Sequence, residues 1–337
     1  MCDSTVFVGL DYHQGSVQVC VENQGGEVLL NRRCRNDWSA IAVAVERCGR
    51  VGRAAIESCC GAADLAEELV HQAGWSVDLA HPGYVQRMKS SPDKTDFSDA
   101  RMLADLERVG YLPKVWLAPQ EVRELRRLVR FRQQLVDERR NSKLRIRALL
   151  RDQRIREAPV HPWTQPWIAW IKSTEALSEQ SRWIVNRLLR RMETVIQEIG
   201  EVEERLGEVT KGDPMIEALC SLKGIGSITA WTIRAEIGRF DRFRTGKQLA
   251  RFCGLSPRNA SSGARVADSG LIKAGNRQLR ATLMEAAHRL IRFDPHWVSF
   301  ACDLLKRGKP KCVVVAATAN RWMRWLFHQM QPTRLAA

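Results

Sequence analysis

The stretch TVFVGLDYHQGSVQVCVENQGGEVLLNRRC, residues 5–34, contains three short apolar runs separated by turn residues. Residues 5–11 are rich in β-branched side chains, and residues 16–22 alternate apolar and polar side chains, which is the period of a β-strand. HQG and QGGE lie between the runs as turns. Connections this short join antiparallel strands, so the stretch predicts a three-stranded meander.

After this meander the pattern changes to alternating helix and strand. The predicted elements are a helix at 37–49 with Asp37 as its N-cap, a strand at 52–58, a helix at 62–74 and a strand at 75–81. Three antiparallel strands followed by alternating helix and strand is the order of a ribonuclease-H-like α/β sheet, although several other mixed folds share it. We expect residues 1–118 to form this α/β domain.

The texture of the sequence changes in the middle of the chain. Residues 121–157 place leucines at helical spacing and carry thirteen Arg and Lys against six Asp and Glu, and a second long amphipathic helix is predicted over 182–209. Two long helices joined by a loop predict an antiparallel helical arm, a coiled coil, spanning residues 119–212. Residues 213–337 are expected to form a third domain, helical throughout to about residue 330.

The charge balance indicates the class of partner. The chain has 53 Lys and Arg against 38 Asp and Glu, a net charge of +15, which favours a polyanion, most often nucleic acid. A membrane surface is the competing polyanion, but no apolar run reaches the roughly 18 residues that a spanning helix needs. The N-terminus shows no basic segment followed by an apolar one, so we expect no signal peptide and a cytoplasmic, nucleoid-associated protein.

Ten cysteines raise the question of zinc or disulfides. None stand at C-x-x-C spacing, and Cys59 and Cys60 are adjacent, which suits neither a zinc finger nor a bridge. We expect reduced thiols, most of them buried.

Four carboxylates fall where the predicted strand order brings chain segments together. Asp11 ends the first strand, Glu57 lies near the end of the fourth, and Asp96 and Asp99 open the helix after the fifth. In a ribonuclease-H-like order the first and fourth strands are neighbours at the centre of the sheet. Four converging carboxylates would repel one another unless cations neutralise them. Oxygen ligands with no His or Cys among them suit Mg²⁺ or Mn²⁺, and two such ions can clamp the attacking and leaving oxygens of a phosphodiester.

Each acid also has an ordinary structural interpretation. Asp11 could be a turn residue, Glu57 a strand-end charge, and Asp96 an N-cap with Asp99 at position N3. Asp105 falls on another helix face and is expected to be solvated. Taken together, at these places in this fold order, the four acids favour metal binding.

Two further segments carry features of nucleic-acid binding. ALCSLKGIGSITAWTIRAEIG, residues 218–238, predicts two helices joined by a GIG turn, which lets a phosphate approach the second helix's free N–H groups; an ordinary tight turn is the alternative. In residues 249–289 a polar loop rich in Ser, Gly and Arg is followed by a helix with a basic first turn. The residues that we expect to contact nucleic acid in these segments are Lys223, Gly224, Gly226, Arg258, Arg265, Lys273, Arg277 and Arg280.

The polar loop also contains Ser261 and Ser262, directly before Gly263. A serine in such a loop is most often a turn or cap residue. A serine that attacks phosphate would instead need nearby cations to stabilise the developing charge, which Arg258, Arg265 or Lys273 could supply. No histidine lies close in sequence, so no catalytic triad is indicated.

Nearly end to end, the chain resembles the DEDD-type transposases of bacterial insertion sequences, the insertion sequence 110 family. The fragments that carry the resemblance are GLDYH, AIESCCG, KTDFSDARMLADL, LKGIGSITA and the GLSPRNASSGARV…IKAGNRQLR run. The resemblance implies a RuvC-like nuclease domain with Asp11, Glu57, Asp96 and Asp99 as the acids, a coiled-coil arm, and a C-terminal domain with a nucleophilic serine. By position that serine is Ser262, with a one-residue ambiguity from Ser261.

The resemblance also implies partners and a reaction. Family members are similar in assembling as tetramers on two DNA duplexes, a donor and a target, and several use a structured bridge RNA to choose them. The serine would form a covalent phosphoserine link, and the carboxylate–Mg²⁺ site of a different subunit would complete the active centre. Two alternatives stay open: a metal-dependent junction endonuclease in which Ser262 only shapes its loop, and a non-catalytic nucleic-acid-binding protein.

Overall fold

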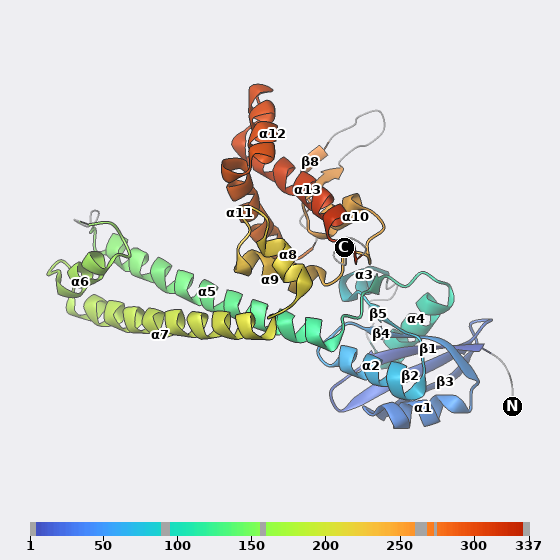
Figure 1. The fold of residues 1–337 in the computed structure, drawn as a ribbon. Coiled ribbons are helices and arrows are strands. Elements are labelled where there is room, and N and C mark those ends of the chain that lie inside the picture. Colours follow the sequence, from blue (N-terminus) through green and yellow to red (C-terminus); the bar gives the residue numbers. More distant parts are fainter. Residues whose placement is uncertain (1–4, 89–94, 156–159, 260–267, 273–274, 333–337) are drawn as a thin grey trace. The chain divides into compact units, whose positions relative to one another are not determined.

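The computed structural model describes residues 5–88, 95–155, 160–259, 268–272 and 275–332 of the chain. These residues form two compact units, an N-terminal unit up to Pro119 and a C-terminal unit from Gln120 onward, and each is described separately. Figure 1 labels the elements of both.

The N-terminal unit is built on a six-stranded mixed sheet in the order β3-β2-β1-β4-β5-β6. Its strands are β1 (Thr5–Tyr12), β2 (Ser16–Asn23), β3 (Val28–Arg35), β4 (Arg50–Glu57), β5 (Val77–Ala80) and β6 (Lys114–Val115). Strands β1, β2 and β3 pair antiparallel, whereas β4 runs parallel to β1 and to β5. The meander, the strand order and the central β1–β4 neighbours predicted from the sequence are therefore confirmed, and this order fits a RuvC-like fold.

Helices cover both faces of this sheet. They are α1 (Trp38–Glu46), α2 (Ala62–Ala73), α3 (Pro82–Met88) and α4 (Asp96–Arg108). Helices α1 and α2 pack on the face formed by Val6, Val8 and Leu10, and α3 and α4 pack on the other. Strand alternation sends successive side chains to opposite faces, so Gly9 and Asp11 lie on the α4 side of β1. The sequence analysis missed α3 and β6, which are too short to show a period.

The C-terminal unit is mostly helical. Its elements are α5 (Gln120–Asp152), α6 (Gln165–Ser173), α7 (Glu179–Val209), α8 (Pro214–Cys220), α9 (Ser227–Ile237), α10 (Gly246–Phe252), β7 (Pro257–Asn259), β8 (Asp268–Leu271), α11 (Arg277–Phe293), α12 (Pro295–Lys306) and α13 (Lys311–Gln329). The prediction of a region that is helical throughout is wrong at one point, because β7 and β8 pair as an antiparallel ribbon. The ribbon flanks residues 260–267, which lie outside the described residues.

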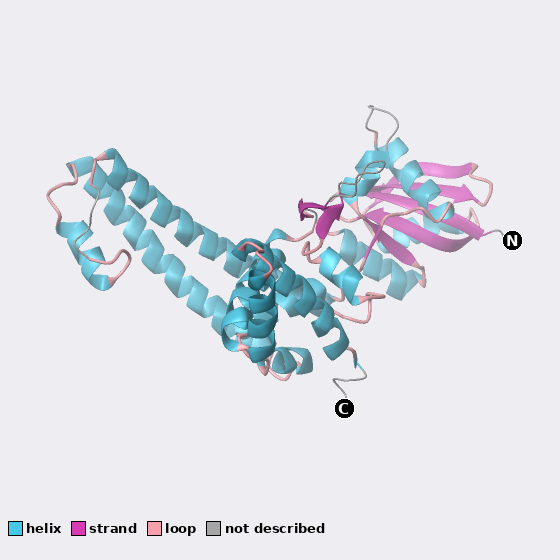
Figure 2. Cartoon of the chain, turned by 90° about the horizontal axis from the view of Figure 1, so that it is seen from above, coloured by secondary structure: helices cyan, strands magenta, loops and turns pink. Residues whose placement is uncertain are grey.

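The two long helices α5 and α7 lie side by side in the C-terminal unit (Figures 1 and 2). Leu135 of α5 and Val195 of α7 belong to the same apolar core, and Arg132 pairs with Glu203 at 2.7 Å. A smaller core, built around Trp167, lies between the far ends of these helices and α6. Both long helices are therefore as expected, while their classification as a coiled coil stays a prediction.

The described cysteines are free thiols, but five of them are exposed and only Cys20 and Cys253 are fully buried. Their reduced state agrees with the expectation, whereas the expectation of burial is wrong for most of them. Among the described residues no helix is both long and apolar enough to cross a membrane.

Candidate carboxylate site at the end of the central strands

Asp11 and Glu57 are placed by the parallel pairing of β1 and β4. Leu10 pairs with Ile56, and Asp11 and Glu57 are the next residues on the two strands. Both follow residues that face α1 and α2, so alternation puts both on the α4 face of the sheet. The two central strands thus end with one carboxylate each, on the same side.

Helix α4 comes unusually close to this face because β1 has a glycine there. A Cβ atom on Gly9 would lie 1.9 Å from the carbonyl oxygen of Ala100 and 2.5 Å from the backbone nitrogen of Ala104. Both of these helix residues are alanines and fully buried, so small side chains on both sides allow the contact. The close approach brings the first turn of α4 to the end of β1.

A capping box fixes where α4 begins. The hydroxyl of Thr95 accepts a hydrogen bond from the backbone nitrogen of Ser98, and the hydroxyl of Ser98 accepts one from the backbone nitrogen of Thr95. Thr95 is therefore the N-cap, so the alternative in which Asp96 caps the helix is wrong. Asp96 is the first helical residue and Asp99 lies one turn later, with only 5% of its surface exposed.

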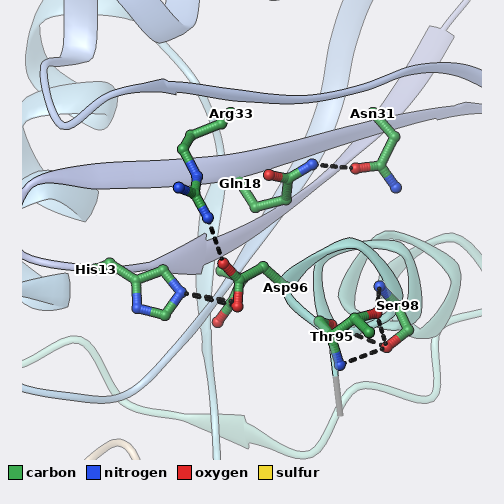
Figure 3. Close-up of polar contacts among 8 residues, drawn as sticks. His13, Gln18, Asn31, Arg33, Thr95, Asp96 and Ser98 are labelled. Carbon is green, nitrogen blue, oxygen red and sulfur yellow. Dashed lines mark hydrogen bonds and ion pairs between the residues drawn. The ribbon is translucent and has the colours of Figure 1, made fainter. Parts of the chain in front are cut away.

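Asp96 contacts two cationic or polar groups from the sheet (Figure 3). One carboxylate oxygen lies 3.3 Å from Nε2 of His13, and the other accepts a hydrogen bond of 2.9 Å from the guanidinium of Arg33. Arg33 belongs to strand β3, and its side chain is 66% exposed. The carboxylate of Asp96 is thus turned toward the sheet.

The neighbouring side chain on β3 fixes the same turn of the helix. The amide of Asn31 donates to the carbonyl oxygen of Phe97 at 3.1 Å, and Gln18 of β2 donates to Asn31 at 2.7 Å (Figure 3). This chain of hydrogen bonds ties the backbone beside Asp96 to two strands.

His13 joins Asp11 to Asp96. Its Nε2 lies 3.2 Å from a carboxylate oxygen of Asp11, and the ligand atoms of the three residues all lie within 4.8 Å of one another. The sequence analysis considered only acids here and missed His13. The signal was present in GLDYH itself, two residues after Asp11 in the turn that leaves β1.

The electrostatics of Asp11 reflect its neighbours. Burial raises the pKa of this carboxyl above its ordinary value, and the charges of Asp99 and Asp96 raise it further, while His13 opposes the shift. Asp96 and Asp99 are therefore both close enough to Asp11 to repel its charge. A divalent cation would relieve this repulsion.

Glu57 stands at the same end of the sheet. Burial raises the pKa of the Cys59 thiol, and the charge of Glu57, with a smaller effect from Asp11, raises it further. Both carboxylates thus act on one thiol in the loop after β4. Three oxygen-bearing side chains and one imidazole form a donor set that Mn²⁺ accepts readily and that Mg²⁺ accepts through its oxygens.

The structure also locates the expected nucleic-acid contacts. Helices α8 and α9 are joined by a tight turn in which Gly224 has a left-handed φ of +80° and Gly226 is the N-cap of α9. Lys223 is exposed at this turn, as expected. The helix–turn–helix geometry predicted from the GIG sequence is therefore present.

The remaining predicted residues lie around the β7–β8 ribbon and the start of α11. Arg258 lies on β7 and is exposed, while Arg277 and Arg280 lie in the first turn of α11. Asn276 caps this helix by accepting hydrogen bonds from the backbone nitrogens of Gln278 and Leu279. The other predicted residues, Ser261, Ser262, Arg265 and Lys273, lie outside the described residues.

Comparison with known proteins gives two family matches. Residues 8–154 match a transposase family described as DEDD_Tnp_IS110, and residues 216–301 match the family described as Transposase IS116/IS110/IS902. The first match spans all four acids of the site, and the second spans the α8–α9 turn. The chain belongs to the IS110 family of transposases.

Curated relatives agree with this assignment. The chain is 26% identical over 333 residues to the transposase for insertion sequence element IS1111A of Coxiella burnetii, covering 97% of this chain and 90% of the relative. It is 29% identical to a probable family 20 transposase of Pseudomonas aeruginosa, covering 81% of this chain and 82% of that one. It is 25% identical to the transposase for insertion sequence element IS1328 of Yersinia enterocolitica, covering 84% and 83%. The IS110-family chain is thus an enzyme that acts on DNA.

Proposed function

We propose that this transposase cuts and rejoins DNA by combining a divalent-cation site formed by Asp11, Glu57, Asp96 and Asp99 with a serine nucleophile, Ser262. The observation that supports the cation site most strongly is the convergence of Asp11, His13 and Asp96 within 4.8 Å at the end of the central strands. Mg²⁺, or Mn²⁺ in its place, would supply charge stabilisation at the phosphodiester oxygens. The protein's own side chains hold the site: Arg33 and Asn31 orient the start of α4, and Gly9 sets its distance from β1.

The serine step is supported by family membership and by the cations around its loop. In this step the Oγ of Ser262 forms a bond to phosphorus, one P–O bond of the strand breaks, and the leaving strand oxygen takes a proton while the serine loses one. Arg258 and Arg277 stand on the two sides of the loop and would stabilise the charge that develops on the phosphate. The two catalytic groups would come from different subunits of a tetramer bound to donor and target DNA.

Trapping tests the serine. A protein–DNA adduct that survives denaturation, and that is absent in Ser262→Ala, would support the nucleophile, with Ser261→Ala as the matched control. Adducts that persist in Ser262→Ala and vanish in Ser261→Ala would move the assignment by one residue. Unchanged strand exchange in both variants would overturn it and favour the alternative, a metal-dependent junction endonuclease.

The acids are tested independently of the serine. Asp96→Asn and Asp99→Asn should each abolish cleavage that depends on Mg²⁺ or Mn²⁺, because each removes a charge from the site without changing side-chain size. Unaffected cleavage in both variants would overturn the carboxylate assignment. DNA binding without any cation-dependent cleavage, in the unsubstituted chain, would support a non-catalytic role for this copy.

We propose further that helix α5, in the coiled-coil arm of residues 119–212, grips nucleic-acid phosphates, including those of a bridge RNA. This is supported by the row of exposed arginines along α5, namely Arg127, Arg140, Arg145, Arg147 and Arg151. Neutralising two of them, as in Arg140→Gln with Arg145→Gln, should weaken binding and reduce its salt dependence by about two phosphate contacts. Sequencing the RNA that co-purifies with the full chain tests the guide, and a failure to recover any structured non-coding RNA would count against it.

A further inference from the structure

A cavity of about 230 Å³ lies beside the α8–α9 turn in the C-terminal unit. Three of the residues that line it are tryptophans, from α12 and α13: Trp297, Trp322 and Trp325. Leu222 and Lys223 line it from the α8–α9 turn. For comparison, an apolar protein cavity of roughly 150 Å³ holds one benzene ring, so this one has room for a larger planar ring.

The three tryptophans differ in accessibility. Trp297 and Trp322 are buried, with 5% and 1% of their surface exposed, and belong to the main core of the unit. Trp325 is 38% exposed and is therefore the indole whose face remains available. Trp297 is held by edge-to-face contacts with His296 and Phe300, at centroid distances of 4.8 and 6.1 Å. The aromatic floor of the cavity is thus rigid before any ligand enters.

The rim of the cavity carries polar groups. Lys223 is exposed on one side, and Asp294 lies on another, fixed because its carboxylate accepts hydrogen bonds from the backbone nitrogens of His296 and Trp297. Apolar walls with a few fixed polar groups are typical of sites for small planar molecules. A cation and an acceptor on the rim can serve a phosphate and the N–H groups of a base, respectively.

The surroundings indicate which planar molecule this is. Lys223 belongs to the helix–turn–helix segment that we expect to bind DNA backbone, and the β-carbon of Arg289 lies 3.3 Å from where a Cβ on Gly224 would be. The net charge of +15 favours a polyanion over a neutral ligand. Strand exchange requires DNA with unpaired bases, and such bases stack on exposed aromatic side chains.

We propose that this tryptophan cavity receives an unpaired nucleobase of a DNA strand whose backbone lies along the α8–α9 turn. The base stacks on Trp325 above the floor of Trp297 and Trp322, and Lys223 contacts its phosphate. This rests on the proposed function and adds to it the form of DNA that the C-terminal unit prefers, namely strands with unpaired bases.

Photocrosslinking tests the cavity directly. The full chain carrying Asp96→Asn, which stops cleavage, is mixed with a single-stranded oligonucleotide containing 5-iododeoxyuridine and irradiated with long-wavelength ultraviolet light. Mass spectrometry should locate the crosslinked base in peptides of α12 or α13 that line the cavity, and Trp325→Ala should abolish that crosslink. Crosslinks confined to other segments would overturn the proposal.

Affinity provides a second readout. Trp325→Ala should weaken single-strand binding about 10-fold, the size typical of one lost base–aromatic stack, and leave duplex binding unchanged. Trp325→Phe should retain most of the affinity, and Trp183→Ala, which removes a tryptophan that is 59% exposed on α7, is the matched control. Equal loss for single strand and duplex, or no loss, would overturn the proposal. So would a change in oligomeric state with intact single-strand binding, because the cavity would then receive a second copy of the chain.

These outcomes are separable from the carboxylate site. Base binding is measured in a chain with an altered acid, so it does not depend on cation-driven cleavage. If Asp96→Asn still cleaved DNA, the carboxylate assignment would fall while the cavity result stood.

Discussion

The substitution Gly9→Ala tests how β1 and α4 build the carboxylate site. The new Cβ would lie 1.9 Å from the carbonyl oxygen of Ala100, and an ordinary contact needs about 3.4 Å, so the helix must move away by about 1.5 Å. The obstructing atoms belong to the backbone, so no side chain can turn aside. Overpacking of this kind destabilises a domain by roughly 1–3 kcal/mol.

The displacement matters more for activity than for stability. Asp96 and Asp99 move with α4, whereas Asp11 stays on β1, so the distance between them changes by more than the ~0.5 Å that active sites tolerate. A misplacement of about 1 Å can lower a rate about 100-fold. We therefore expect Gly9→Ala to lose about two orders of magnitude in cation-dependent DNA cleavage while keeping most of its circular dichroism signal.

The matched control is Gly15→Ala in the turn after β1. A Cβ atom on Gly15 would meet nothing within 4 Å, so both stability and cleavage should stay within about twofold of the unsubstituted chain. The assays are urea unfolding followed by circular dichroism and single-turnover cleavage at saturating Mn²⁺. Cleavage by Gly9→Ala within twofold of the control would refute the close approach of α4 as the basis of the site.

Three other substitutions probe charges in the two units. Arg33→Gln removes the cation paired with Asp96, and because this pair is exposed, Mn²⁺ binding measured by electron paramagnetic resonance should tighten by no more than about fivefold; weaker binding would contradict a competing role for Arg33. Glu22 has a pKa raised by burial first and by Asp105 next, so its contribution to stability is fully present below 4.5 and is lost as the pH rises through its folded pKa. Urea unfolding should accordingly show the unsubstituted chain losing stability relative to Glu22→Gln between about pH 4 and pH 7, and a constant difference would refute this. Arg130→Ala removes the paired hydrogen bonds of 2.8 and 3.0 Å on the buried Glu236 and should destabilise the C-terminal unit by about 1–2 kcal/mol in thermal unfolding, whereas Arg191→Ala, from an exposed pair, should change it by less than about 0.5 kcal/mol.

Much of the N-terminal unit could be predicted because its strands have a clear period. Val6, Val8 and Leu10 alternate with residues of the other face, and the short turns allow only antiparallel pairing for the first three strands. Placing Asp11 and Glu57 together followed from that strand order. The N-cap was assigned one residue too late, because Asp96 and Thr95 are both good caps and only the reciprocal hydrogen bonds with Ser98 decide between them.

The contacts that complete the site could not be read from local sequence. Arg33 reaches Asp96 across 63 residues, and only the antiparallel register of β2 and β3 puts it on the correct face. His13 was overlooked because an all-oxygen ligand set was assumed. The tryptophan cavity combines residues of α12 and α13 with the α8–α9 turn, so it exists only in the folded unit.

Iron-mediated backbone cleavage tests the central claim, the cation site of the four acids, most directly. Fe²⁺ replaces Mg²⁺ in the full chain, and hydrogen peroxide with ascorbate generates radicals that cut the polypeptide next to the bound ion. The account predicts cuts near residue 11, near residue 57 and around residues 96–99, suppressed by excess Mg²⁺ and absent in Asp96→Asn. Cuts located elsewhere, or the same cuts in Asp96→Asn, would contradict it.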